Sequence, residues 1–139
     1  MTNLKIRKKK IKDLIPLIKI TKDSFPSPIR HIPYLLFFML VAEENSKVAG
    51  FIVLLTKSKM GEIALMAIDK NYRGQNISSK LLTEAFGYLK LKGKKYCMSK
   101  VRINNPKALK FYKKNGFQVK KIKKRPILGD VYLIEKKLL

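Results

Sequence analysis

The 139-residue sequence predicts an α/β domain with a mixed, mostly antiparallel sheet of six to seven strands and helices on both faces. Two observations predict this class. Strand-like segments in the first half follow one another as a meander, whereas strands and helices alternate in the second half. The meander excludes an all-parallel sheet, and the later alternation favours helices packed against a mixed one.

In the first half, the alternating run 4–7 and two mainly apolar runs predict strands, and apolar residues at helical spacing predict a helix. Asn45-Ser46-Lys47 lies between two strand-like runs and predicts a hairpin. The expected elements are a strand at 4–7, an amphipathic helix at about 10–22, a second short helix ending near 36, and strands at 37–43 and 48–55.

In the second half, one side of a long predicted helix is apolar through Leu81, Leu82, Ala85, Phe86 and Leu89. The elements expected here are a strand at 61–69, the long helix at 78–92, a strand at 95–101, a helix at 105–115, and strands at 117–123 and 131–137.

Length and composition fit one domain over residues 1–139, with 46% hydrophobic residues available for a core. The single cysteine, Cys97, excludes an internal disulfide and is expected to be buried in a strand. The longest apolar run, 34–42, is too short to span a bilayer. No secretion signal is visible, so we expect a soluble, cytoplasmic protein that does not associate with membranes.

The charge is strongly positive, with 32 Lys+Arg against 9 Asp+Glu and a formal net charge of +23. One interpretation is a polyanionic partner such as a ribosome surface or nucleic acid. The other is a lysine-rich proteome, because the basic residues are spread over many predicted strands and helices rather than concentrated in a tail.

A glycine-containing turn follows the apolar strand that ends at 67–69. Residues 71–77 are polar apart from Tyr72 and Ile77, and an amphipathic helix begins directly after them. A strand, a turn and a helix in this order point several backbone N–H groups at one spot, with the helix dipole behind them. Such a spot binds phosphate, so the turn predicts a phosphorylated cofactor.

A second motif covers residues 101–117. Asn105 is a suitable N-cap, Pro106 suits the first helical position, and Gly116 suits a left-handed helix end. Asn105, Ala108 and Tyr112 are spaced so that they share one helix face. An amide, a small residue and a phenol therefore share one surface, although a capped helix with one buried tyrosine would have the same pattern.

Together, these motifs resemble the GNAT superfamily of acetyl-CoA-dependent N-acetyltransferases. The turn is similar to the family's pyrophosphate segment, Y-R-G-x-G-I-G-x-x-L-L, and residues 105–117 are similar to its N-x-x-A-x-x-x-Y-x-x-x-G-F segment. Val101-Arg102-x-Asn104-Asn105, Ser24-Phe25-Pro26 and residues 129–133 further resemble the branch that acetylates protein N-termini, including ribosomal-protein alanine and archaeal N-alpha acetyltransferases.

The resemblance implies an N-acetyltransferase with acetyl-CoA as cofactor and a protein or peptide amine as substrate. Its chemistry is direct attack of an amine on the thioester. Tyr112 would protonate the departing thiolate, for which an ordinary tyrosine pKa of about 10 is suitable. The implied cofactor-binding residues are Met66, Ala67, Ile68, Arg73, Gly74, Gln75, Asn76, Ile77, Ser78, Ser79, Asn105 and Tyr112.

The sequence departs from the family's pattern at three positions. Asn76 and Ser78 stand where the family's loop has glycine, and Lys100 stands where the bacterial alanine-acetylating branch has a glutamate. Asparagine tolerates left-handed backbone, and serine is small and can donate a hydrogen bond. Glu62 is then the best remaining candidate for the general base, or it binds the substrate's ammonium group.

Other residues add no catalytic or metal centre. The only histidine, His31, is expected on the surface or in a substrate loop, and no His, Cys, Asp and Glu residues have metal-ligand spacing. A base-poor site favours an α-amine, whose pKa of roughly 8 lies below that of lysine. Acetylation of a lysine or a small amine, and a catalytically silent module that binds a polyanion, remain the alternatives.

Overall fold

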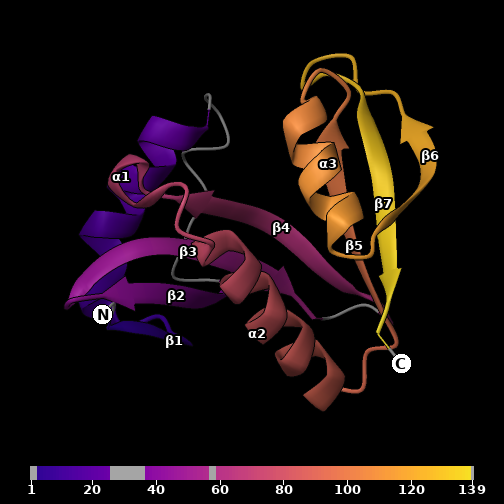
Figure 1. Ribbon diagram of the computed structural model, residues 1–139. Helices are drawn as coiled ribbons and strands as arrows, with labels where there is room; N and C mark the ends of the chain where they lie inside the picture. Colours follow the sequence, from indigo (N-terminus) through magenta and orange to yellow (C-terminus); the bar gives the residue numbers. More distant parts are fainter. Residues whose placement is uncertain (1–2, 26–36, 57–58, 139) are drawn as a thin grey trace.

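The computed structural model describes residues 3–25, 37–56 and 59–138 (Figure 1). Within these ranges, seven strands form one sheet in the order β1-β2-β3-β4-β5-β7-β6. All neighbouring strands are antiparallel except β4 and β5, which are parallel. The predicted mixed sheet is therefore confirmed. The strands are β1 (Leu4–Lys8), β2 (Phe38–Glu44), β3 (Lys47–Leu55), β4 (Gly61–Ile68), β5 (Tyr96–Arg102), β6 (Gln118–Lys123) and β7 (Val131–Lys137).

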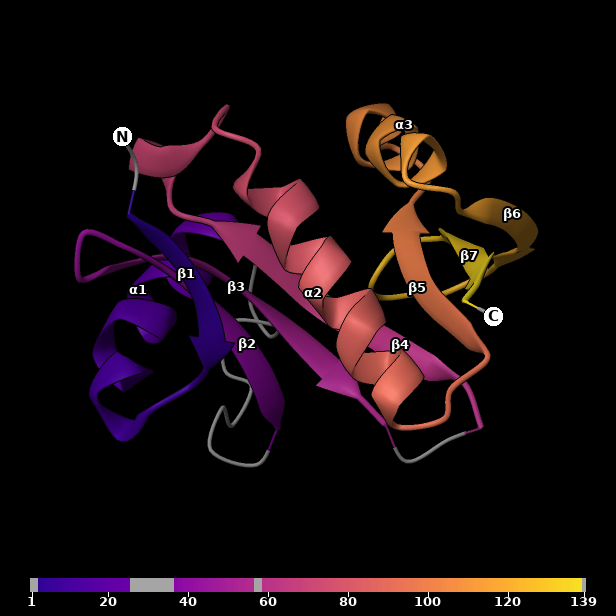
Figure 2. The ribbon, with the colours of Figure 1, turned by 60° about the horizontal axis from the view of Figure 1, so that its bottom comes forward.

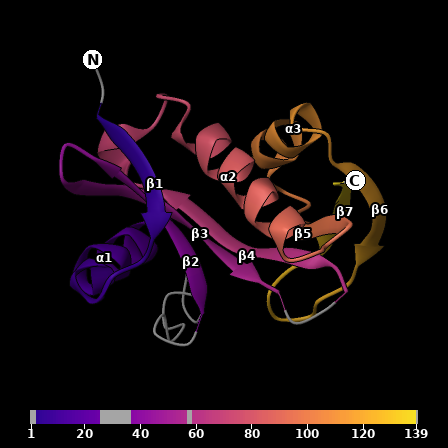
Figure 3. The same ribbon diagram turned by 90° about the horizontal axis from the view of Figure 1, so that it is seen from below.

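Three α-helices in the described ranges cover the two faces of the sheet. Helix α1 (Leu14–Ser24) lies on one face, and α2 (Ile77–Leu91) and α3 (Pro106–Lys114) lie on the other (Figures 2 and 3). This arrangement confirms the prediction of helices on both faces. None of the described helices is long and apolar enough to cross a membrane.

The central strands are buried on both faces, and alternate residues belong to different cores. Helix α1 packs on one core, whose strand residues are Met39, Val41, Phe51, Val53 and Ala67. Helix α2 packs on the other, whose strand residues include Leu40, Ala42, Ile52, Leu54 and Ile63. A slip of one residue in register would exchange the two cores, so packing fixes the register.

Most elements lie within one or two residues of their predicted bounds, with two differences at the start of the chain. The hairpin turn contains only Asn45 and Ser46, both at positive φ, as a two-residue turn between twisted strands requires. The helix expected at about 10–22 begins as a 3₁₀ turn, Ile11–Asp13, and becomes α-helical only at Leu14. Proline lacks a backbone N–H and fits only a first turn, so Pro16 favours this late start.

The second short helix, Pro26 and His31 lie outside the described residues.

Strands β4 and β5 form a fork that determines where the candidate site lies. They pair only through Gly61 with Cys97 and Glu62 with Met98, and beyond these pairs they diverge (Figure 1). Gly61 lies against Leu89 of α2, where an added Cβ would come within 2.4 Å of a Leu89 side-chain carbon. The glycine therefore lets α2 lie close to the sheet at the base of the fork.

A buried ion cluster joins β1, β2 and the start of α1. The Arg7 guanidinium donates to both Asp13 oxygens, at 2.7 and 2.9 Å, and to Glu43 at 2.9 Å. The Asp13 carboxylate also accepts from the backbone N–H of Lys10 at 2.6 Å. Asp13 is only 1% exposed, and the hydrogen bond from Arg7 holds the pKa of its carboxyl below the usual value.

We expect Asp13→Ala to lower the free energy of unfolding by roughly 3 kcal/mol at pH 7, because it removes the buried partner of the partly buried Arg7 guanidinium. Since the folded-state pKa of Asp13 is depressed, its stabilisation is complete above the unfolded pKa of about 4 and is lost as pH falls through the folded value. Urea unfolding at pH 7 and pH 3 measures both effects. Asp23→Ala, at an exposed position of α1, is the control and should cost less than about 0.5 kcal/mol.

Candidate active site

A cavity of about 600 Å³ occupies the gap between the diverging strands, and we refer to it as the fork cavity. Its lining comes from both faces of the sheet. Asn105, Ala108 and Tyr112 of α3 line it on one face. Lys100 and Arg102 alternate along β5 with the core residues Cys97 and Val101, so they project from the other face. The cavity therefore passes through the sheet.

The wall formed by β4 contains a β-bulge. Leu54 of β3 pairs with Ile63 and Val53 pairs with Leu65, so Ala64 between them has no partner in β3. A bulge re-aims the backbone locally and is frequent beside active sites. Across the fork, the Ser99 hydroxyl donates to the Ile63 carbonyl at 3.0 Å and satisfies one group that the missing strand pair leaves free.

The Tyr112 side chain is the only buried phenol among the described residues that line the fork cavity. Its ring packs edge-on against Phe111 and Phe117, at centroid distances of 5.3 and 5.2 Å, and the residue is 8% exposed. Burial raises the pKa of Tyr112 to about 12, an effect that the neighbouring Ser99 hydroxyl partly opposes. The phenol is therefore protonated near neutral pH and can act as a proton donor.

Glu62 and Lys100 face each other at the base of the fork. Lys100 Nζ lies 3.9 Å from Glu62 Oε1, which is a loose ion pair, and both side chains remain partly exposed. Glu62 is the only carboxylate among the described residues that line the fork cavity. An acidic group able to bind or deprotonate an amine is thus available at this position alone.

A second cavity of about 550 Å³, the loop cavity, adjoins the fork cavity at Met66 and Asn105 and extends to the start of α2. Gly74 has φ +82° and Asn76 has φ +61°, so both residues of the turn are left-handed. The first helical hydrogen bond runs from Lys80 N to Asn76 O at 3.2 Å, and no side chain caps the helix. The amides of residues 77–79 consequently have no intrahelical acceptor and can bind an anion.

Positive charge surrounds these amides. Arg73, Lys107 and Lys114 line the loop cavity, and no carboxylate does so in the described parts of the chain. The Arg73 side chain is oriented by a hydrogen bond of 3.3 Å from Nε to the Ile68 carbonyl. The cavity is therefore suited to a ligand with several negative charges.

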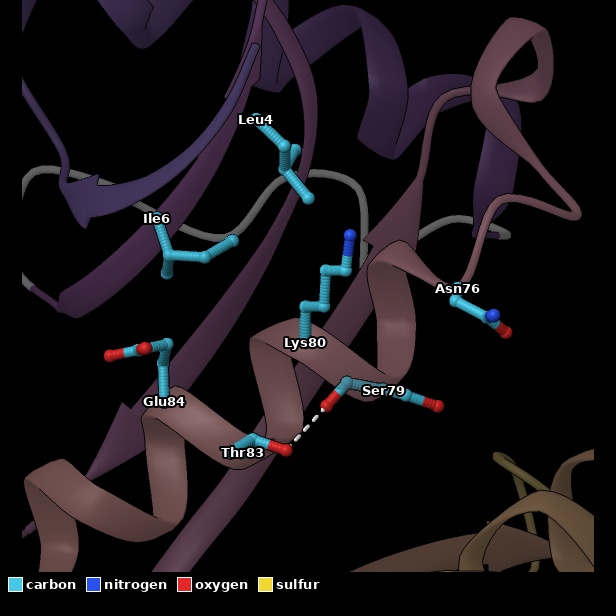
Figure 4. A pocket seen from close by; sticks show the side chains of 7 residues that line it. All are labelled: Leu4, Ile6, Asn76, Ser79, Lys80, Thr83 and Glu84. Atoms are coloured by element: carbon cyan, nitrogen blue, oxygen red, sulfur yellow. Dashed lines mark hydrogen bonds between the residues drawn. The ribbon is translucent and has the colours of Figure 1, made fainter. Parts of the chain in front are cut away.

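A groove on the other flank of α2 lies apart from this arrangement. Leu4 and Ile6 of β1 face α2 there, and Lys80 extends from the helix toward β1 (Figure 4). Lys80 thus lines this groove and not the loop cavity.

Asn105 caps α3 as predicted. Its side-chain oxygen accepts from Ala108 N at 3.1 Å, and Pro106 occupies the first helical position. The helix ends at Lys114, and Gly116 just beyond it has φ +95°, the left-handed conformation predicted for the helix end. Because the Asn105 oxygen is used by the cap, its amide NH₂ is the group that can point a donor at a ligand.

The structure brings most of the predicted site residues to these two cavities. Met66 lines both, and Gln75 is exposed and lines neither. Ser24 and Phe25, from the early segment, line both cavities as well. The residues that line the loop cavity as expected are Ala67, Ile68, Arg73, Gly74, Asn76, Ile77, Ser78, Ser79 and Asn105.

Sequence reasoning missed Ser99, Ala64, Lys107 and Lys114. Ser99 had one available signal, since it is the polar member of an otherwise apolar inward-facing series, Cys97-Ser99-Val101. The bulge at Ala64 has no local signal, because it depends on the register with β3. The two lysines could not be separated from the many others in this basic chain.

The divided sheet, the anion-binding turn and the buried phenol define a domain of the acyltransferase class. The chain belongs to the GNAT acetyltransferase family: residues 36–119, more than half of its length, match the Acetyltransferase (GNAT) domain. Members of this family use acetyl-CoA as the acetyl donor. The family expected from the sequence motifs is therefore confirmed.

Known proteins resemble the chain in sequence and in fold. A putative ribosomal protein bS18-alanine N-acetyltransferase of Bacillus subtilis is 33% identical over 75% of this chain and 68% of its own length. An uncharacterized N-acetyltransferase of Methanocaldococcus jannaschii is 31% identical over 60% of this chain, but the match spans only 40% of that protein.

Two solved structures share the fold. The crystal structure of Ard1 from Thermoplasma volcanium has a TM-score of 0.86 at 22% identity and covers 98% of each chain. The PaiA N-acetyltransferase of Thermoplasma acidophilum, solved with coenzyme A, has a TM-score of 0.78 at 25% identity and covers 97% of this chain and 99% of that one.

Cys97 is buried at the base of the fork, as predicted, and burial raises the pKa of its thiol to about 12. Because a thiolate is the reactive form, we expect no labelling by iodoacetamide in the folded protein at pH 8 and complete labelling in 6 M guanidinium. Mass spectrometry of the intact protein measures both. Rapid labelling of the native chain would contradict this burial.

Asn76 should tolerate glycine but not a β-branched residue, because its left-handed backbone holds the start of α2. We expect Asn76→Gly to keep its affinity for coenzyme A within about threefold, and Asn76→Val to weaken it about tenfold or more, since strain of roughly 1–2 kcal/mol would displace the free amides. Isothermal titration calorimetry measures the affinity. Equal affinities for the two variants would show that the left-handed turn is not needed.

Proposed function

We propose that the protein is an acetyl-CoA-dependent N-acetyltransferase whose acceptor is the N-terminal α-amine of a protein or peptide. The observation that carries this proposal is the fork cavity, which is lined from both faces of the sheet and has Tyr112 in its wall. Two molecules can reach the phenol from opposite sides. The bS18-alanine acetyltransferase relative, whose name states a protein N-terminal acceptor, supports the choice of amine.

The residues of the loop cavity fit the cofactor. The free amides at 77–79 would bind the pyrophosphate, and Arg73 would add charge beside them. Residues 66–68 pair with β3 on one edge of β4, but no strand pairs with the other edge. Apart from the Ile68 carbonyl, which accepts from Arg73, the backbone groups of Met66, Ala67 and Ile68 that point to this open edge would pair with the amide groups of the pantetheine arm. The NH₂ group of Asn105 would donate to the same arm.

When bound, acetyl-CoA supplies a thioester whose carbonyl carbon forms a C–N bond with the amine while its C–S bond breaks. The Tyr112 phenol holds a proton in this wall at neutral pH and would give it to the departing sulfur. The proton lost by the amine would return through water to the tyrosinate. No nucleophilic side chain is needed, in agreement with the inert thiol of Cys97.

Glu62 would receive the acceptor. Its carboxylate lies at the base of the fork and is held only loosely by Lys100, so it can bind an ammonium group or accept a proton from it through water. An α-amine with a pKa of about 7.7–8.0 is substantially neutral near pH 8, whereas a lysine amine at about 10.4 is not. A site with one carboxylate therefore favours the α-amine.

Acetylation of matched peptides tests the acceptor. Labelled acetyl-CoA is incubated with peptides that carry a free α-amine and with the same peptides blocked at that amine, each also containing an internal lysine. We expect label only on the free peptides. Equal labelling of the blocked peptides would reject the α-amine in favour of lysine, and absence of coenzyme A binding by calorimetry would reject the enzyme altogether.

We expect Tyr112→Phe to lower kcat about a hundredfold, because general acid catalysis is lost. The KM for acetyl-CoA should change less than about threefold, since the ring and its packing remain. Retention of full turnover would remove the proton-donor role. Lys113→Gly, which destabilises the same helix at an exposed position outside both cavities, controls for a general effect on α3.

The pH dependence of the wild-type enzyme gives a separate prediction. With a pKa of about 12, Tyr112 is roughly 1% ionised at pH 10, whereas an ordinary tyrosine would be half ionised. We therefore expect kcat/KM to rise as the acceptor amine loses its proton and then to stay level up to pH 10. A decline with a midpoint near pH 9 would contradict the buried, protonated phenol.

A further inference from the structure

The mouth of the fork cavity on the face away from α3 is basic. Lys100, Arg102 and Arg125 contribute to its lining, and Glu62 is the only carboxylate among the described lining residues. These cations are distinct from Arg73, Lys107 and Lys114, which line the loop cavity on the cofactor side. Each side of the molecule thus has its own positive charge.

The three cations differ in how many hydrogen bonds and ion pairs they form within the protein. The Arg125 guanidinium donates to the Gly129 carbonyl at 2.7 Å and is committed to its own loop. Among the residues that the structure describes, the Lys100 ammonium contacts only Glu62, at 3.9 Å. Arg102 is half-buried, and within the described parts of the chain its guanidinium has neither an ion-pair partner nor a hydrogen-bond acceptor.

The carboxylate in the adjoining loop does not neutralise this mouth. Asp130 accepts from the backbone N–H of Arg125 at 3.0 Å and pairs with the Lys124 ammonium at 3.2 Å. It does not line the cavity. A half-buried guanidinium without a partner has lost part of its hydration and gains most from a carboxylate, which can accept two parallel hydrogen bonds from it.

The positions along β5 indicate where on an acceptor that carboxylate would lie. Lys100 and Arg102 follow Met98, the last residue paired across the fork, by two and four positions. At a strand rise of about 3.3 Å they lie roughly 7 and 13 Å from the base of the fork. An extended peptide whose amine is held at Glu62 has its third to fifth residues at similar distances.

We propose that the enzyme selects acceptors with aspartate or glutamate at the third to fifth positions, and that Arg102 is the principal specificity-determining residue, with Lys100 assisting. This inference rests on the proposed function, since it requires an α-amine at the base of the fork. Lys100 would move from Glu62 to the acceptor carboxylate, and this would leave Glu62 to the amine. Lys100 and Arg102 would therefore bind the acidic side chains of the acceptor and would not contact the cofactor.

Peptide kinetics test the proposal. Three peptide pools share mixed Ala, Ser, Gly and Met first residues and an otherwise identical, lysine-free sequence, and carry three glutamates, three glutamines or three arginines at positions 3–5. For the wild-type enzyme we expect kcat/KM to be roughly tenfold higher with glutamate than with glutamine, and lower still with arginine. This preference should shrink as the salt concentration rises, because the charges lie at a solvent-connected mouth.

Charge-reversal variants test whether Arg102 causes the preference for acidic acceptors. Arg102→Glu should lower the glutamate-to-arginine ratio of kcat/KM at least tenfold, and a ratio within one variant is independent of any overall loss of activity. Lys100→Gln should lower it by a smaller factor and serves if Arg102→Glu fails to fold, as judged by thermal unfolding. Lys110→Glu, an exposed position of α3 outside both cavities, should leave the ratio within twofold of wild type.

The outcomes separate the two proposals. Equal rates for the three pools, or a preference for arginine, would overturn the acidic acceptor while leaving N-terminal acetylation intact. A ratio in Arg102→Glu equal to that of the wild type and of Lys110→Glu would overturn the role of Arg102. Acetylation of none of the pools, with acetylation of a lysine peptide or a small amine in the same assay, would overturn the proposed function and this inference with it.

Discussion

The architecture depends on one constraint: two adjacent parallel strands stop pairing after two residues each. Beyond Glu62 and Met98, the facing edges of β4 and β5 carry backbone N–H and C=O groups without a neighbouring strand. Such groups are costly to bury unless something else satisfies them. Ser99 donates to the Ile63 carbonyl and Arg73 donates to the Ile68 carbonyl. The other groups on these edges border cavities where a ligand's own amide groups can substitute for the missing ladder. The early end of pairing between β4 and β5 thus both opens the sheet and leaves the backbone groups that a ligand can bind.

The elements around the fork keep it open and give each side a different chemistry. Gly61 allows α2 to lie close to β4 at the base, so the start of α2 is fixed relative to the unpaired edge. Helix α3 follows β5 directly and brings Tyr112 over the gap, where burial keeps its proton in place. On the other face, alternation along β5 places Lys100 and Arg102 outward. One strand therefore contributes to two binding surfaces of different character.

The structural features that could be predicted from the sequence are those determined by residues close together in the chain. The turn at 73–77 and the helix from Asn105 to Gly116 were predicted closely, because caps, proline and left-handed residues act within a few positions. Asn76 indeed adopts the left-handed backbone that glycine usually supplies. The late start of α1 was not predicted: Pro16 is a local signal for it, but the Asp13 side chain before the helix is held by Arg7 from another element. The bulge at Ala64 and the separate roles of the many cations depend on strand pairing across the chain, which no local pattern records.

The passage of the fork cavity through the sheet also bears on the order of events during turnover. A pocket with a single mouth forces one molecule to enter first and the other to leave first. Here the loop cavity extends to the start of α2, whereas Lys100 and Arg102 line the fork cavity from the face opposite α3. Neither occupant of such a passage stands in the path of the other, so sterics alone impose no sequence of entry and exit. A compulsory order would instead require that binding of one occupant changes the affinity of the protein for the other.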